Sequence, residues 1–379
     1  MKSSRRSAVA PFMVMDIMER VREMEAGGRD VIHREVGQPS APAPRAAREA
    51  VAHAMSGEPL GYTVALGLPE LREAIADLYR RRHGIALDPS RVIVTAGSSG
   101  AFTLAFLSLF EAGARVALGD PGYPSYRNIL SALGIEPVRI ETGPESRWQP
   151  RPEDLGEADG LLVASPANPS GTMLDREALA ALARACSARG AGFISDEIYH
   201  GLTYAGPAVS ALEVTDDVFV INSFSKYWSM TGWRIGWMVV PPGMVRTVER
   251  LAQNFFICAP HVSQIAALAA LQAEDECEAN RGVYEVNRSL LMNELPGAGF
   301  TEFAPADGAF YLYADVTNMT DDSRAFCERM LCEAGVAATP GHDFDPIRGN
   351  SFVRFSFARS EAHIAEGARR LKTWLKGRS

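Results

Sequence analysis

The sequence predicts an α/β protein with a large domain, built on a mostly parallel sheet flanked by helices, and a smaller α+β domain. From Val92 onward, short apolar runs alternate with helical patterns, which is typical of parallel strands joined by crossover helices. The last third of the chain instead mixes separate strand-like and helical runs. The length of 379 residues also exceeds the size at which a single core usually divides into two.

The composition is that of an ordinary globular protein and argues against several kinds of partner. Apolar residues make up 47% of the chain and charged residues 22%, so neither disorder nor a fibrous fold is indicated. The net charge of −8, with scattered basic residues, disfavours nucleic acid and anionic membrane surfaces. No segment approaches the roughly 20 apolar residues of a membrane span. We therefore expect no nucleic-acid partner and no membrane partner.

The cysteines and the N-terminal residues favour a reducing compartment. The five cysteines are odd in number and include no Cys-x-x-Cys pair, so we predict neither a disulfide framework nor a metal site. This usage fits the cytoplasm. The basic start and short apolar run imitate a signal peptide only faintly, because Pro11 interrupts the run and a polar helical pattern begins at Asp16. We interpret the start as a structural arm.

The region before the first predicted strand is mainly helical. A helix is expected from Asp16 to Ala26, followed by a backbone turn at Gly37. Apolar residues at helical spacing predict two amphipathic helices, at residues 47–55 and 71–79, the second beginning after Pro69. Between them Tyr62 lies in a glycine-flanked loop, where a tyrosine ordinarily serves packing or lies on the surface.

Several turns in the alternating region could carry chemistry. The predicted strands are residues 92–95, 115–118, 161–164, 192–195, 218–221 and 234–240. Residues 95–100 read TAGSSG, where free amides at a helix start can face an anion. Residues 120–126 form a rigid turn with two tyrosines, and residues 165–171 form an Asn-Pro turn, which alone usually has no chemistry. Asp196 ends a buried strand and needs a cationic or donor partner.

The C-terminal third is predicted to form the smaller domain. Helical patterns run from Gly243 to Leu295, strands are expected at residues 309–316 and 352–357, and a helix is expected near residues 323–333. In the last strand three apolar residues share one face, so Arg354 points to the opposite one. Its guanidinium could bind a carboxylate in bidentate fashion, although a salt bridge to a glutamate is the ordinary role.

Residues 223–236, SFSKYWSMTGWRIG, contain the strongest chemical signal. Lys226 directly follows an apolar strand, and a lysine in such a setting readily loses its proton or forms a Schiff base. The hydroxyls of Ser223, Ser225 and Ser229, together with Arg234, could hold a phosphate beside the amine. Pyridoxal 5′-phosphate satisfies both requirements. An isolated Ser-x-x-Lys would more commonly be a surface lysine in a serine-rich loop.

This string closely resembles the lysine signature of the fold-type I, pyridoxal-phosphate-dependent aminotransferases of class I/II, which include aspartate, aromatic and alanine aminotransferases. Six motifs match in the expected order along nearly the whole chain. The resemblance implies a seven-stranded sheet in the large domain. It also implies an arm and part of the small domain at residues 1–44, a cofactor domain at 45–275 and the rest of the small domain at 276–379.

The resemblance further implies a set of cofactor-binding residues. Lys226 carries the cofactor as a Schiff base, Tyr123 stacks on its ring and Asp196 keeps its pyridine nitrogen protonated, which makes it a better electron sink. Asn168 and Tyr199 hydrogen-bond its phenolic oxygen. The phosphate is held by Ser98, Ser99, Gly100, Ser223, Ser225 and Arg234, and by Tyr62 of a neighbouring subunit, so that the enzyme is a homodimer with shared active sites.

The resemblance implies a ping-pong transfer of an amino group from an L-amino acid to a 2-oxo acid, with 2-oxoglutarate or pyruvate as the expected acceptor. Lys226, Asp196 and Tyr199 are the expected catalytic residues, and Gly37, Asn168 and Arg354 are expected to bind the substrate. Some relatives that use dicarboxylic substrates have a lysine near the position of Ser99, so its absence argues against aspartate as the donor.

Two alternatives to an aminotransferase remain open from the sequence. A carbon–sulfur β-lyase on the same fold would use the same lysine and cofactor but release ammonia and pyruvate. A cofactor-sensing transcription regulator would attach a helix-turn-helix module ahead of the aminotransferase-like part. We expect no such module, because the chain has no room for one before Gly37.

Overall fold

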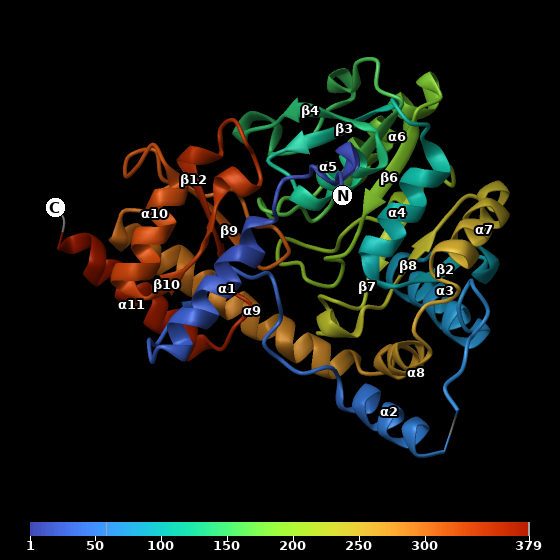
Figure 1. Ribbon diagram of the computed structural model, residues 1–379, viewed down its shortest axis with the longest axis horizontal. Coiled ribbons are helices and arrows are strands. Elements are labelled where there is room, and N and C mark those ends of the chain that lie inside the picture. Colours follow the sequence, from blue (N-terminus) through green and yellow to red (C-terminus); the bar gives the residue numbers. More distant parts are fainter. Residues whose placement is uncertain (58, 378–379) are drawn as a thin grey trace.

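The computed structural model describes residues 1–57 and 59–377, and its central feature is a seven-stranded sheet (Figure 1). The strands lie in the order β2-β8-β7-β6-β5-β3-β4. Their bounds are β2 Val92–Thr95, β3 Arg115–Asp120, β4 Glu136–Glu141, β5 Gly160–Ala164, β6 Gly192–Asp196, β7 Phe219–Ser223 and β8 Gly236–Val239. Strands β3 to β7 are parallel, whereas β8 is antiparallel to both β7 and β2. The sheet is therefore mostly parallel, as predicted.

Helices cover both faces of this sheet because the strands are apolar on both sides. Alternate strand residues pack into two separate hydrophobic clusters, so that Ile93 and Ile194 face one side while Val94 and Phe193 face the other. The first side is covered by α4 (Gly97–Leu109), α5 (Pro124–Leu133) and α7 (Val245–Phe255). The second side is covered by α3 (Pro69–His83), α6 (Arg176–Arg189) and α8 (His261–Ala270).

A smaller lobe lies beside the sheet and combines the two ends of the chain (Figure 1). Its antiparallel sheet has the order β11-β12-β9, formed by Thr339–Pro340, Phe352–Ser356 and Tyr311–Asp315. Near the N-terminus, β1 (Ile32–His33) pairs in parallel with β10 (Val336–Ala337). The helices of this lobe are α1 (Met13–Ala26), α9 (Glu274–Glu294), α10 (Ser323–Arg329) and α11 (Glu361–Lys376).

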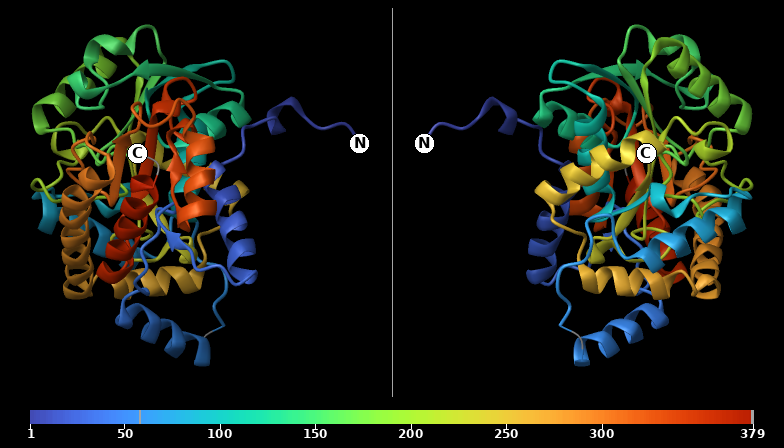
Figure 2. Two further views of the ribbon diagram at one scale, coloured as in Figure 1. Left: turned by 90° about the vertical axis from the view of Figure 1, so that its left-hand side faces the viewer. Right: turned by 90° about the vertical axis from the view of Figure 1, so that its right-hand side faces the viewer.

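Two segments extend from this body. Helix α2 (Arg45–Gly57) protrudes and packs against α8 (Figure 1). The first residues of the chain extend outward past α5, which the short helical turn Arg5–Ser7 contacts (Figure 2). The domain boundaries at residues 44 and 275 stay a prediction, although the β1–β10 pairing ties the N-terminal segment to the C-terminal lobe.

The structure corrects three details of the predicted elements. The predicted strand 234–240 is shorter, because Arg234 lies in a turn with φ +53° and β8 begins at Gly236. The edge strand β4 was not predicted, since only one of its residues is fully buried and it lacks an apolar run. The predicted helix 323–333 ends at Arg329 and continues as a single π-helical turn, Met330–Ala334.

No helix in residues 1–57 or 59–377 is long and apolar enough to cross a membrane.

Candidate active site

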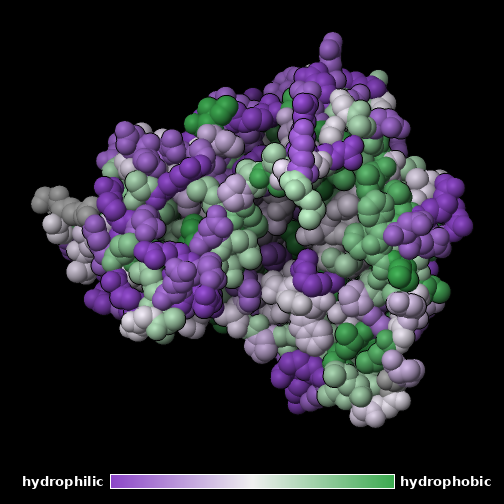
Figure 3. Space-filling view, in the orientation of Figure 1, coloured by the Kyte–Doolittle hydropathy of each residue, from purple (hydrophilic) through white to green (hydrophobic). Residues whose placement is uncertain are grey.

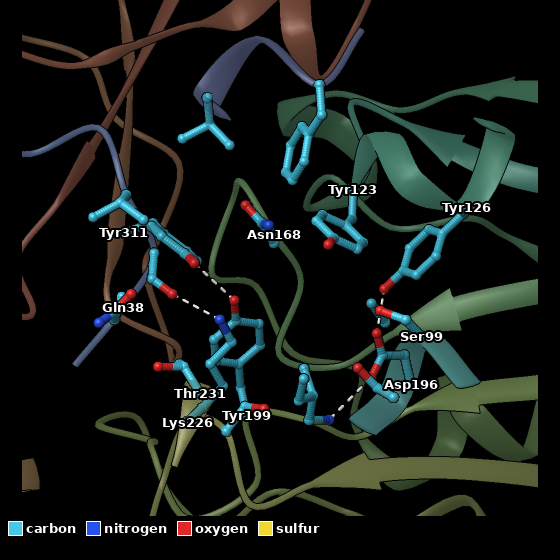
Figure 4. Close-up of a pocket in the computed structure, with 18 of the residues that line it drawn as sticks. Gln38, Ser99, Tyr123, Tyr126, Asn168, Asp196, Tyr199, Lys226, Thr231 and Tyr311 are labelled. Carbon is cyan, nitrogen blue, oxygen red and sulfur yellow. Dashed lines mark hydrogen bonds between the residues drawn. The ribbon is translucent and has the colours of Figure 1, made fainter. Parts of the chain in front are cut away.

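A cavity of about 220 Å³ lies between the two lobes, and Figure 3 shows the surface hollowed there. Residues that follow the carboxyl ends of the large sheet's parallel strands meet at this point, together with α1, the segment after β1 and two strands of the smaller lobe. Of the predicted site residues, the lining includes Gly37, Ser98, Ser99, Tyr123, Asn168, Asp196, Tyr199, Ser225, Lys226, Arg234 and Arg354 (Figure 4).

Lys226 follows β7 and points its amine into the cavity. Its Nζ donates to the carbonyl oxygen of Gly37 at 2.7 Å. Burial and, to a smaller extent, the nearby charge of Arg354 lower the pKa of Lys226 to about 8, although Asp196 acts in the opposite direction. A substantial neutral fraction is therefore available near pH 8, which suits an amine that acts as nucleophile or base.

Asp196 ends β6 and is buried beneath the cavity. Its carboxylate accepts hydrogen bonds from the Tyr126 hydroxyl and from the backbone amide of Ile198. Burial raises the pKa of Asp196 to about 6 despite these bonds. A cationic group in the cavity would stabilise the ionised carboxylate, so the site favours the cationic or hydrogen-bond-donating part of a ligand at this point.

Arg354, on β12, is held in place by several acceptors while part of its guanidinium stays available. Its Nη1 donates to Asn168 Oδ1 at 2.9 Å, and its Nη2 donates to the Glu35 carbonyl at 2.5 Å and to Thr339 Oγ1 at 3.1 Å. Its Nε is buried and has no partner in the described part of the chain. Because Asn168 accepts through its oxygen, its amide nitrogen remains free to donate to a ligand in the cavity.

The start of α4 and Arg234 form a cradle for an anion. Helix α4 begins at Gly97 without a side-chain cap, so its first amides are left for a ligand near Ser98 and Ser99. Gly97 has φ +73°, and a Cβ added there would lie 2.5 Å from Nη2 of Arg234. Arg234 itself is held by a 2.9 Å bond from Nη1 to the Thr231 carbonyl. This combination of amides, hydroxyls and a guanidinium suits a phosphate.

Three predicted site residues do not line the cavity of this chain. Gly100 lies further along α4. The hydroxyl of the buried Ser223 donates to the Ile235 carbonyl and lies 2.8 Å from the hydroxyl of Ser225, which does line the cavity. Tyr62 is 83% exposed and away from the cavity. Ser229, considered for the phosphate, also lies outside the lining.

The structure brings in residues that sequence reasoning missed. Tyr311, on β9, lies with its hydroxyl 2.8 Å from that of Tyr199. Tyr126 is the donor to Asp196, and its position three residues after Tyr123 was a usable signal. An apolar wall is formed by Phe12, Val14, Met15, Val36 and Ile198, for which no local motif gave a sign.

No group of three or more His, Cys, Asp or Glu side chains that could hold a metal ion occurs among the described residues.

Comparisons with known proteins identify close relatives over almost the full length. Residues 29–371 match the family model for class I and II aminotransferases. The chain is 51% identical over 378 residues to a valine–pyruvate aminotransferase of Mycobacterium tuberculosis, covering 98% of this chain and 97% of the relative. It is 32% identical over 378 residues to an aspartate/prephenate aminotransferase of Thermus thermophilus, covering 97% of both. The crystal structure of an aminotransferase from Mycobacterium tuberculosis matches with a TM-score of 0.97 over 100% of both chains, at 49% identity.

Proposed function

The chain belongs to the class I and II aminotransferases, which depend on pyridoxal phosphate, and we propose that this enzyme uses an amino donor with an apolar side chain and pyruvate as acceptor. The transfer of an amino group from an amino acid to a 2-oxo acid follows from family membership. The nature of the two substrates is the part that we propose.

The single observation that carries this proposal is the apolar wall of the cavity. Phe12, Val14, Met15 and Val36 line the side that α1 and the segment after β1 provide. Among the described residues, the cations that line the cavity are Lys226, Arg234 and Arg354. Each already has a role as amine, phosphate ligand or α-carboxylate ligand, so this chain leaves no cation for a distal carboxylate. Apolar surface instead favours a hydrocarbon side chain.

The similarities point the same way. The relative with 51% identity is named for valine and pyruvate, whereas the relative named for aspartate and prephenate shares 32%. Ser99 also offers a neutral hydroxyl where some enzymes for dicarboxylic substrates have a lysine nearby. These observations support a branched aliphatic amino acid such as valine as the donor.

The residues around the cavity fit pyridoxal phosphate. The start of α4 and Arg234 would hold its phosphate, because Gly97 leaves room for the guanidinium there. Asp196 would pair with its ring nitrogen, and Asn168 and Tyr199 would donate to its phenolic oxygen. When bound, pyridoxal phosphate supplies an electron sink for the substrate's α-carbon.

The protein's own groups then position the substrate and move the proton. Arg354 would bind the α-carboxylate with the part of its guanidinium that Asn168, Glu35 and Thr339 leave free. Lys226 would act as a neutral amine that moves the proton between the substrate's α-carbon and the cofactor's aldehyde carbon, in one direction in each half of the reaction, which a pKa of about 8 permits.

We also infer that the enzyme works as a homodimer in the cytoplasm. Large apolar side chains are exposed around α2 and the start of α8, namely Met55, Tyr62, Val64, Phe255 and Ile257. Such exposure favours a second copy of the chain as the partner. All five cysteines are free, which suits a reducing compartment.

A panel of donors and acceptors tests the substrate proposal. The purified enzyme is assayed with valine, isoleucine, alanine, phenylalanine and aspartate, each with pyruvate and with 2-oxoglutarate, and both products are quantified by chromatography. We expect valine with pyruvate to exceed aspartate by at least about 100-fold in kcat/KM, since a buried unpaired carboxylate is costly. Comparable rates with aspartate would contradict the proposal. Release of ammonia and pyruvate from a cysteine conjugate, in place of transfer, would favour the β-lyase.

A further inference from the structure

We propose that Tyr311 is a positioning residue that directs the hydroxyl proton of Tyr199 into the cavity. The proposal rests on the proposed function in one respect, namely that Tyr199 donates to the cofactor's phenolic oxygen. Tyr311 lies on β9, in the smaller lobe, whereas Tyr199 follows β6 of the large sheet. Their contact therefore joins the two lobes at the site.

The hydroxyls of Tyr311 and Tyr199 form one hydrogen bond, so only one of the two donates its proton to the other. Their oxygens lie 2.8 Å apart, both side chains are buried, and Figure 4 shows them meeting beside Lys226. Within residues 1–57 and 59–377, neither hydroxyl makes another hydrogen bond. If Tyr311 donates, the proton of Tyr199 stays free for an acceptor in the cavity. If Tyr199 donates, that proton is used up and Tyr199 can only accept.

The surroundings of Tyr311 favour it as the donor. The guanidinium carbon of Arg354 lies 4.3 Å from the centre of the Tyr311 ring. A cation over a phenol ring draws electron density from it and makes its hydroxyl a stronger donor. The ring of Tyr199 has a more distant cation, the Lys226 amine at 5.8 Å from its centre, so the stronger effect falls on Tyr311.

Gly37 limits where the Tyr311 hydroxyl can go. A Cβ added at Gly37 would lie 1.8 Å from the Tyr311 oxygen, so the backbone there is packed directly against it. With that side closed, the hydroxyl is held toward Tyr199. The same glycine carbonyl accepts the bond from Lys226, which places all three groups in one small region.

The experiment uses the spectrophotometric pH titration of the bound cofactor in the holoenzyme. When its phenolic oxygen loses a protein donor, this oxygen holds the proton shared with the lysine nitrogen more tightly, and the titration midpoint rises. We expect Tyr199→Phe to raise the midpoint and Tyr311→Phe to raise it by a smaller amount, about 0.3–1 pH unit, the size of one modest hydrogen bond. In the Tyr199→Phe background, Tyr311→Phe should add no shift.

Tyr313→Phe is the matched control, because Tyr313 lies two residues further along β9, is equally buried and does not line the cavity. It should leave the midpoint unchanged. Gly37→Ala gives a second variant that keeps Tyr311 but displaces its hydroxyl, and it should raise the midpoint like Tyr311→Phe.

The possible outcomes distinguish a failure of the positioning role of Tyr311 from a failure of the proposed role of Tyr199 as a donor to the phenolic oxygen. If Tyr199→Phe shifts the midpoint but Tyr311→Phe does not, or if Tyr311→Phe shifts it equally with and without the Tyr199 hydroxyl, the positioning role is overturned while the proposed function stands. If Tyr199→Phe itself has no effect, the premise about Tyr199 fails, and the role of Tyr311 fails with it.

Discussion

At the scale of single residues, Lys226 is a cation in surroundings that disfavour its charge. It is largely removed from water and lies near the like charge of Arg354, while Asp196 compensates only in part. The folded chain therefore disfavours the protonated amine and leaves a neutral fraction available. A lower stability of the folded protein is common where the pKa of a functional group is shifted in this way.

The unfavourable free energy of placing the protonated Lys226 amine in these surroundings predicts that Lys226→Met stabilises the cofactor-free protein at pH 7. The pKa falls from 10.5 in the unfolded chain to about 8 in the folded one, so the unfolded chain binds more protons between these values. The stability contribution of Lys226 therefore rises with pH from about 8 to 10.5, and below pH 8 the penalty is complete. We expect a gain of about 3 kcal/mol in the free energy of unfolding at pH 7, shrinking toward pH 10.

Urea denaturation of both proteins at pH 7 and pH 10, without cofactor, measures this difference. Lys2→Met serves as the control, because Lys2 is exposed in the N-terminal arm and should change little at either pH. A Lys226→Met protein that is less stable than its parent at pH 7 would contradict the interpretation.

Residues of the site were predictable where a short sequence motif contains the functional side chain. Lys226 and Asn168 each lie in a recognisable turn after a strand, Asp196 ends a strand, and the structure brings all three to one cavity. Tyr311 could not be found in this way, since its partner Tyr199 lies 112 residues away and the contact depends on how the lobes meet. The residues of the apolar wall were hidden for the same reason, because Phe12 contacts a residue far along the chain, with its ring 5.6 Å from that of Tyr123 between centroids.

At the scale of elements, the start of α4 and the turn at Arg234 form one structural unit. Gly97 and Arg234 both have positive φ values, and the guanidinium occupies the space that a side chain at position 97 would need. The helix is apolar and largely buried, so its position is fixed by the core rather than by a cap. The proposed anion site thus combines the start of a buried helix with a turn in which Arg234 has a positive φ.

Gly97→Ala is predicted to weaken cofactor binding. A methyl group at this position would displace Arg234, and we expect the Kd for pyridoxal phosphate to rise about 10- to 100-fold, equivalent to about 1.4–2.8 kcal/mol. Titration of the cofactor-free protein, followed by fluorescence, measures the affinity.

Gly113→Ala is the matched control for this substitution. Gly113 also has a positive φ, +90°, but has nothing within 4 Å of an added Cβ and lies outside the cavity. It should carry a similar backbone strain without a change in cofactor affinity. Equal effects of the two substitutions on Kd would show that strain, rather than contact with Arg234, is responsible.

Several element boundaries were predictable because a proline or glycine marks them. Pro69 begins α3 as expected, and Gly134 ends α5 in the left-handed conformation. The start of β8 was less clear, because the run from Ile235 to Val240 is apolar on both sides of Gly236, where the strand begins. Its antiparallel direction was also hidden, since a buried run reads the same in either direction.

At the scale of the whole molecule, one part of the surface exposes large apolar side chains. In helix α2, Ala47 and Ala54 are buried, but Met55 is 67% exposed on the helix that protrudes from the body. Figure 3 shows apolar residues gathered over this end of the molecule. The exposed Tyr62 follows directly, so the surface that favours a partner also carries a residue predicted to complete an active site.

The last prediction is that mixing two defective variants restores activity. Lys226→Ala chains lack the amine, and Tyr62→Ala chains lack the hydroxyl that we expect to reach the phosphate in the neighbouring subunit, so each homodimer should be poorly active at limiting cofactor. If Tyr62 acts across the interface, a mixed dimer has one site with both native residues and one with neither, and activity appears after chain exchange. If Tyr62 acts within its own chain, every site of the mixed dimer lacks one residue, and no activity returns. Native mass spectrometry verifies the exchange, so an inactive mixed dimer would reject the shared site, and a monomeric mass for the active native enzyme would reject the dimer itself.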